Sequence, residues 1–248
     1  MRPDGRQPDQ IRPITIEPDF IRYPEGSVLY RAGDTVVLCN TSVLDRTPAF
    51  LRGSGEGWVT AEYAMLPRAT DTRSEREVNR GRPSGRSQEI QRLIGRSLRA
   101  AVRRDLLGER TLAVDCDVLQ ADGSTRTASI SGGWMALVLA LGQMYEQGLI
   151  SEWPLTNQIV AVAVGLIGGE ARVDLDYGED FDCDVDLNLV FTGGGRLIEI
   201  QGTAEGEPFS RDQLGTLLEV GWHGAEQVFA KQREVVGPRV EALGLSLP

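Results

Sequence analysis

Residues 115–131 read DCDVLQADGSTRTASIS, and the pattern changes twice within this stretch. In its first half, apolar and acidic side chains alternate as in a half-buried strand. Asp122-Gly123 is a turn signal, and a strongly apolar helical segment follows it. Because the first N–H groups of a helix lack intrahelical partners, this helix start can bind an anion. The alternative is an ordinary turn with Thr125 or Thr127 as the N-cap.

The chain on either side of this stretch predicts two groups of strands joined by helices. Short alternating or β-branched runs between turn residues mark strands at 14–17, 27–31, 35–43, 58–65, 159–167, 171–177, 187–192 and 196–201. Apolar residues at helical spacing mark helices at 88–107, 127–147 and 211–235. The helix at 127–147 is apolar nearly all round, so we expect it in the core. This order predicts an α+β fold, with mixed β-sheets packed against α-helices.

The composition is that of a globular protein. Of the 248 residues, 41% are apolar and 25% are charged, and the longest apolar run falls short of the ~20 residues of a membrane span. The first residues are polar and lack the apolar region of a signal peptide. The three cysteines are widely spaced, which argues against a disulfide framework or a zinc site. We therefore expect a cytoplasmic protein without a membrane segment.

Charge and rare residues exclude several kinds of site. His223 is the only histidine, so a Ser-His-Asp triad or a His-ligated metal elsewhere is excluded, and the only lysine, Lys231, is not placed for a Walker phosphate loop. The formal charge of −10 argues against a general nucleic-acid-binding surface. The charge is uneven, however. Residues 68–110 hold twelve arginines against six acidic residues, and residues 174–186 hold seven acidic residues and no basic one.

The acidic segment carries aspartates at alternate positions, namely Asp180, Asp182, Asp184 and Asp186. Alternate side chains of an extended segment point to one face, so we expect these carboxylates to form a ladder. Crowded carboxylates repel one another unless a cation or an arginine neutralises them. Ligation by oxygen alone indicates Mg²⁺ or Mn²⁺. The alternative is an exposed loop with acidic side chains.

Five longer motifs are specific enough to suggest a family. They are MRPDGR at 1–6, GSGEGWVTAEYAMLPRAT at 53–70, SGRSQEIQRLIGRSLRA at 84–100, DCDVLQADGSTRTAS at 115–129 and EIQGTAEGEPFS at 199–210. Together and in this order they closely resemble ribonuclease PH, a family of bacterial phosphorolytic exoribonucleases. The resemblance covers residues 1–235 without a large gap.

The resemblance implies a ribosomal protein S5 domain 2-like fold, with one catalytic domain at residues 1–240 and a loose tail at 241–248. It implies a phosphorolytic 3′–5′ exoribonuclease, a phosphate-dependent nucleotidyltransferase that trims tRNA precursors and processes rRNA. The implied assembly is an RNA-binding homohexamer, a trimer of dimers, with inorganic phosphate as co-substrate and Mg²⁺ or Mn²⁺ as cofactor. Two alternatives are a non-catalytic RNA-binding ring subunit and a hydrolytic metal-dependent nuclease.

The resemblance also implies individual site residues. Phosphate binding falls to four residues, Arg86, Ser124, Thr125 and Arg126. The catalytic aspartates, which are also the metal ligands, fall at Asp180 and Asp186, and the match does not extend to Asp182 and Asp184. RNA binding falls to the loop arginines Arg68, Arg73 and Arg76.

Three positions depart from the family pattern. Ser124 stands where the family usually has glycine, and Phe181 and Cys183 replace residues that are usually small. If the turn requires a positive φ at position 124, serine is strained there. If the turn needs only a backbone N–H, serine serves as well as glycine.

Overall fold

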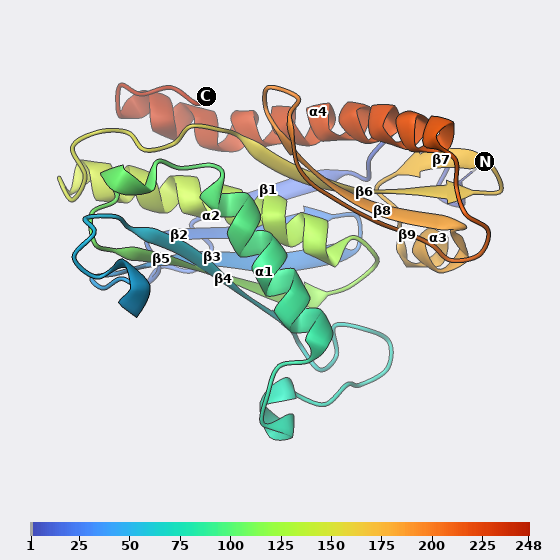
Figure 1. Ribbon diagram of the computed structural model, residues 1–248, viewed down its shortest axis with the longest axis horizontal. Coiled ribbons are helices and arrows are strands. Elements are labelled where there is room, and N and C mark those ends of the chain that lie inside the picture. Colours follow the sequence, from blue (N-terminus) through green and yellow to red (C-terminus); the bar gives the residue numbers. More distant parts are fainter. Residues whose placement is uncertain (1) are drawn as a thin grey trace.

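The computed structural model describes residues 2–248, except for the side chains of Val78 and Arg80. Two β-sheets and four α-helices form the fold (Figure 1). The α+β architecture expected from the sequence is confirmed. The predicted strands before residue 66 differ from the observed ones by at most one residue at either end.

The first sheet has the order β1-β2-β3-β5-β4. Its strands are β1 (Ile14–Pro18), β2 (Gly26–Ala32), β3 (Thr35–Leu44), β4 (Trp58–Met65) and β5 (Thr111–Gln120). All neighbours are antiparallel except β4 and β5, which run parallel. A parallel pair requires a crossover, and the helix α1 (Gly85–Arg99) lies on that connection and packs on β4.

The second sheet is antiparallel throughout, with the order β7-β6-β8-β9. Its strands are β6 (Ile159–Ile167), β7 (Glu170–Val173), β8 (Val185–Thr192) and β9 (Leu197–Ala204). The long helix α4 (Arg211–Ala242) packs on this sheet, and a shorter helix, α3 (Tyr177–Asp182), precedes β8. In Figure 1, α4 runs along one edge of the molecule above both α2 and the second sheet.

The helix α2 (Thr125–Glu146) joins the two sheets. It packs on β2, β3 and β5 of the first sheet and on β6 of the second. Trp134 in its middle is fully buried, and the indole nitrogen Nε1 donates to the carbonyl of Asn157 at 3.0 Å. The expected core position of this helix is confirmed. Because α2 packs on the first sheet on one side and on β6 on the other, the position of its N-terminus between the sheets is fixed.

The acidic segment differs from the expected extended ladder. Residues 177–182 form α3, because Asp176 and Glu179 make a capping box. The Asp176 carboxylate accepts from the N–H of Glu179 at 2.9 Å, and the Glu179 carboxylate accepts from the N–H of Asp176 at 3.4 Å. This local capping outweighs the period-two pattern, so the prediction of one common face for the four aspartates is wrong. The strand predicted at 171–177 likewise ends at Val173.

The end of the chain follows α4. Leu243 is the C-cap of that helix, and the N–H of Leu245 donates to the carbonyl of Val240 at 3.2 Å. Leu245 and Leu247 are partly buried against the core. The boundary expected near residue 240 stays a prediction. No helix within residues 2–248 is long and apolar enough to cross a membrane.

Close packing of the first sheet on α2 depends on a glycine. A Cβ atom added to Gly26 would lie 1.9 Å from the carbonyl oxygen of Ala136 in α2. We expect Gly26→Ala to lower the free energy of unfolding by about 3 kcal/mol, since a backbone atom cannot give way. Gly215 lies at an exposed position of α4, where an added Cβ meets open space. Gly215→Ala should therefore raise the free energy of unfolding by up to about 1 kcal/mol. Urea unfolding measures both, and a Gly26→Ala variant as stable as the wild type would contradict the packing.

Candidate active site

The turn between β5 and α2 opens the candidate site. Ser124 is the N-cap residue of α2 and has φ 54°, in the left-handed region. Among the described residues, no side chain caps this helix end. The alternative of an N-cap at Thr125 or Thr127 is therefore wrong, and the hydroxyl of Thr127 donates instead to the Ser124 carbonyl at 2.9 Å. The first N–H groups of α2 remain without an intrahelical partner, as an anion site requires.

Ser124 has the strained backbone that only glycine adopts freely. A non-glycine residue in this region costs about 1 kcal/mol or more. The hydroxyl of Ser124 donates to the carbonyl of Leu175 at 2.8 Å. The same side chain that introduces the strain thus connects the turn to the segment before α3.

Arg126 points from the first turn of α2 toward α1 and β9. Its Nη1 atom lies 3.3 Å from Oε2 of Glu89 in α1 and donates to Oε1 of Gln201 in β9 at 3.1 Å. The amide of Gln201 also donates to Oε1 of Glu89 at 3.1 Å. Two other elements, α1 and β9, therefore hold this guanidinium of α2, which stays partly accessible.

A cavity of about 410 Å³ lies beside this guanidinium. It is lined by Glu89, Arg126, Asp186, Asn188, Gln201, Gly202 and Thr203. The arginine from the start of α2 and the aspartate from the start of β8 thus face the same space. On one cavity wall, the cationic group can bind an anion and the carboxylate can bind a cation, so that the two ions meet in the cavity.

Electrostatics place Asp180 in the same neighbourhood. Burial raises the pKa of Asp186 to about 6, and the charge of Asp180 adds to the effect, while Arg126 and Arg86 oppose it. Burial also raises the pKa of Asp180, against the lowering influence of Arg86 and Arg126. The two aspartates come from different elements, α3 and β8, yet both interact with the same two arginines. The fold therefore brings the predicted aspartates and phosphate arginines together without the extended ladder.

One oxygen of this group lacks a partner. Oδ1 of Asp186 is buried and has no hydrogen-bond partner among the described residues, whereas Oδ2 accepts from the amide of Asn188 at 3.4 Å. Within the same residues, no group of three or more His, Cys, Asp or Glu side chains gathers as a metal site would.

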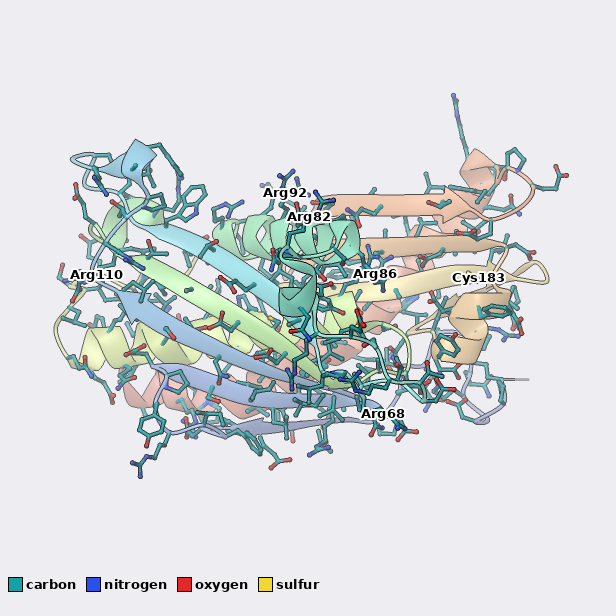
Figure 2. All side chains as sticks on the ribbon, turned by 90° about the horizontal axis from the view of Figure 1, so that it is seen from below. Arg68, Arg82, Arg86, Arg92, Arg110 and Cys183 are labelled. Atoms are coloured by element: carbon teal, nitrogen blue, oxygen red, sulfur yellow. The ribbon has the colours of Figure 1, made fainter. Side chains whose placement is uncertain are left out.

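The other predicted residues lie at different distances from the cavity. Thr125 is buried, and its hydroxyl lies 2.9 Å from the hydroxyl of Tyr63 in β4. Arg86 is exposed at the start of α1. The loop arginines Arg68, Arg73 and Arg76 are exposed between β4 and α1 and do not line the cavity. Figure 2 labels Arg68 and Arg86.

The aspartates outside the family match lie apart from this group. Asp182 is exposed at the end of α3. Asp184 accepts from the N–H of Gly168 at 3.1 Å and so stabilises the turn between β6 and β7.

Cys183 is not suited to act as a nucleophile. Burial raises the pKa of its thiol to about 12, so this residue stays protonated and is a poor nucleophile.

Four residues of the site were not singled out from the sequence. They are Tyr63, Glu89, Asn188 and Gln201. Three of them lie within the quoted motifs, at AEYAM, SQEIQ and EIQGT. Their types alone carry no signal, because Gln, Glu and Tyr are frequent on protein surfaces and only the fold brings them to Arg126, Thr125 and Asp186.

Comparisons with known proteins identify the class. Residues 10–141 match the model described as the 3′ exoribonuclease family, domain 1, and residues 157–223 match domain 2 of the same family. Together these matches span well over half of the chain. The chain belongs to the 3′ exoribonuclease family.

Curated relatives narrow the comparison further. Ribonuclease PH of Bacillus velezensis is 52% identical over 244 residues, which are 98% of this chain and 100% of the relative. Ribonuclease PH of Bacillus subtilis is equally similar, at 52% over the same length. The function expected from the sequence, that of a phosphorolytic 3′–5′ exoribonuclease, is confirmed by these relatives.

Solved structures agree on the fold. Rice (Oryza sativa) Rrp46 has a TM-score of 0.76 at 21% identity, covering 94% of this chain and 98% of the other. The Archaeoglobus fulgidus exosome with RNA bound to the active site has a TM-score of 0.76 at 24% identity, covering 93% and 92%. The expected ribosomal protein S5 domain 2-like fold is confirmed.

The strain at Ser124 has a measurable consequence. Ser124→Ala should lower the free energy of unfolding by about 1–2 kcal/mol, since alanine keeps the strain and leaves the Leu175 carbonyl unpaired. Ser124→Gly loses the same bond but removes the strain, so it should stay within about 0.5 kcal/mol of the wild type. Urea unfolding followed by circular dichroism compares them. Equal losses in both variants would contradict the strain.

The raised pKa of Asp186 makes stability depend on pH. A carboxyl whose folded pKa exceeds its unfolded value binds more protons in the folded state, so stability falls as pH rises from about 4 to about 6. In EDTA, Asp186→Asn should therefore be more stable than the wild type by about 1–2 kcal/mol at pH 7.5. The difference should vanish near pH 4. Thermal unfolding at both pH values measures it, and a pH-independent difference would exclude the carboxyl as its source.

Proposed function

We propose that this chain uses inorganic phosphate to remove the 3′-terminal nucleotides of RNA as nucleoside 5′-diphosphates at the cavity between Arg126 and Asp186. The observation that carries the proposal is the shared cavity itself, with the guanidinium of Arg126 and the half-buried carboxylate of Asp186 on its wall. Attack of phosphate on a phosphodiester brings two anions together. The site must therefore supply positive charge to both of them.

The attacking phosphate binds at the start of α2. Arg126, Arg86, the hydroxyl of Thr125 and the N–H groups of the turn that includes Ser124 are its partners. Arginine matches phosphate by paired hydrogen bonds, and the helix start adds donors that need no side chain. Glu89 lies 3.3 Å from Arg126 and balances its charge until the phosphate takes that place.

Asp180 and Asp186 fit a divalent cation. Oδ1 of Asp186 is a buried acceptor without a partner among the described residues, and burial beside a second carboxylate disfavours its ionised form. Mg²⁺ characteristically takes one or two carboxylates and leaves its other positions to water and substrate phosphates. We therefore propose these two aspartates as ligands of Mg²⁺ or Mn²⁺, which when bound neutralises charge on the reacting phosphodiester.

The leaving 3′-oxygen needs a proton. An aspartate with a raised pKa is a suitable donor, because it still carries a proton near neutral pH. Burial raises the pKa of both Asp180 and Asp186 in the cation-free site, and a bound cation would keep its own ligands deprotonated, so the donor is the aspartate that the cation does not hold. Asn188 and Gln201 orient the Asp186 carboxylate and the Arg126 guanidinium.

The RNA approaches through the loop between β4 and α1. Arg68, Arg73 and Arg76 are exposed there and suit contacts with phosphates, which carry no sequence information. We propose that the RNA is the 3′ end of tRNA precursors, and of rRNA, and that a homohexameric trimer of dimers gathers these loops around one opening. Three free, buried cysteines agree with the reducing cytoplasm as the compartment.

Two other functions are less well supported. A non-catalytic ring subunit would not need Arg126 and Asp186 on one cavity, with Asp180 close enough to influence Asp186 by its charge. A hydrolytic nuclease would need water in place of phosphate and would leave the anion site at the start of α2 without a use. The identity of the relatives, named ribonuclease PH, also favours phosphorolysis.

One assay tests the reaction and its residues together. A 3′-tailed RNA is incubated with Mg²⁺, with and without phosphate, and the released nucleotides are identified by chromatography. The wild type should release diphosphates only with phosphate. Arg126→Ala and Asp180→Asn should reduce that rate by about 10²–10³-fold, because each removes charge aimed at the reacting groups.

A surface variant serves as the matched control. Arg103→Ala breaks an exposed ion pair with Asp105, away from the cavity, and should keep the wild-type rate. Monophosphates released without phosphate would instead support the hydrolase, and no release would support the non-catalytic subunit. Near-normal turnover in Arg126→Ala or Asp180→Asn would remove that residue from the mechanism.

A further inference from the structure

Three arginines near the N-terminus are buried, against the usual exposure of this residue type. They are Arg2, Arg6 and Arg12, whose side chains are 1%, 6% and 4% exposed. Their partners include two buried carboxylates, Asp174 and Glu179. A buried ion pair adds little net stability, since desolvation offsets the attraction. This network therefore calls for a role beyond holding the chain together.

Arg12 binds both halves of the candidate active site at once. Its Nε and Nη2 atoms donate to the carboxylate of Asp174 at 3.0 and 2.7 Å, and its backbone N–H donates to the same group at 2.7 Å. Its Nη1 atom donates to the carbonyl of Asp122. Asp122 begins the turn that leads to Arg126, and Asp174 begins the segment that leads to α3 and Asp180. One guanidinium thus joins the phosphate turn to the carboxylate segment.

The two segments touch directly at the same place. The N–H of Tyr177 donates to the carboxylate of Asp122 at 3.2 Å, in addition to the bond between Ser124 and Leu175. A Cβ atom on Gly123 would lie 2.5 Å from the carbonyl oxygen of Leu175. The contact leaves no room for adjustment, so the spacing of the two halves is set here. We call the contact of residues 122–124 with residues 174–177 the junction.

The carboxylate segment is held rigidly on the far side of the junction. Asp174 has φ 54°, and its carbonyl accepts from Arg2 at 3.0 Å and from Arg6 at 2.9 Å. Arg2 also donates to both oxygens of Glu179, at 2.8 and 2.6 Å. Glu179 is the neighbour of Asp180 in α3. A movement of Arg12 relative to Asp174 would therefore carry Asp180 with it.

We infer that Arg12 is a positioning residue, which through the junction sets the distance between the phosphate held at Arg126 and the carboxylates of Asp180 and Asp186. The inference rests on the proposed roles of these three residues. Arg12 is buried and does not line the cavity. A planar fork with several donors is needed to bind a carboxylate and a carbonyl at once, and lysine, a single point charge, lacks that geometry.

Arg12→Lys tests the inference, because it keeps the charge beside Asp174 and loses the fork. Each half of the site stays intact, so the KM for phosphate should change by less than about threefold. The value of kcat should fall by about tenfold or more, since a shift of about 1 Å between reacting groups can reduce rates by up to about 10²-fold. The control is Arg31→Lys. Arg31 lies on β2 and forms an exposed ion pair with Glu17 of β1, so the kcat of this variant should match that of the wild type. Circular dichroism and the Tm of each variant establish folding at the assay temperature.

A second pair of variants covers the case in which Arg12→Lys does not fold. Asp122→Ala removes the acceptor of the Tyr177 N–H at the partly exposed edge of the junction, whereas Asp122→Asn keeps it. In the alanine variant kcat should also fall, by about threefold or more, and the asparagine variant should stay near the wild type. If Arg12→Lys folds, a lowered Tm with an unchanged kcat in that variant would overturn the inference. If Arg12→Lys does not fold, the same result in Asp122→Ala would overturn it. A wild type that releases no diphosphates would overturn the proposed function instead.

Discussion

A buried guanidinium holds together two segments that are distant in the sequence. Arg12 bonds to Asp174 and to the carbonyl of Asp122, and the two segments close on each other without space for an additional carbon atom at Gly123. Burial alone would favour the neutral form of Asp174, yet Arg12 and Arg6 hold the pKa of that carboxyl below its usual value. Removal of one partner would leave an uncompensated buried charge. The active-site spacing therefore depends on charge pairing in the interior.

The packing of α2 and β8 also fixes the spacing of the active site. The helix α2 is buried along most of its length between the first sheet and β6, so its N-terminus cannot shift without disturbing the core. The strand β8 is paired on both sides within the second sheet, and Asp186 lies near its beginning. The phosphate side of the site thus belongs to one packed layer and the carboxylate side to another. A cavity forms where the two layers meet, with Gln201 of β9 and Glu89 of α1 on its wall.

The local distribution of charge in this protein matters more for its function than the net charge does. The formal charge is −10, yet the exposed arginines before α1 and the arginines at the cavity provide local positive potential. Three further arginines are used inside the molecule, where they neutralise the acidic segment at residues 174–179. Asp186, which follows that segment, lines the cavity, and Asp180 acts on it by charge. This division explains how an acidic chain can bind two anions at one site.

The order of strands and helices follows from the sequence, because hydrophobic periodicity and turn residues are local signals. The turn before α2, proposed as the anion site, and the motifs that identify the family are local as well. Two features were decided by the tertiary structure, and one by a local capping signal that the alternating aspartates concealed. The acidic ladder gave way to α3, since a capping box at Asp176 and Glu179 overrides alternation. Ser124 keeps a strained backbone at the start of α2, and its hydroxyl donates to the carbonyl of Leu175, fifty-one residues away. Tyr63, Glu89, Asn188, Gln201 and Arg12 acquire their roles only through partners from other elements, since long-range contacts leave no periodic pattern in the chain.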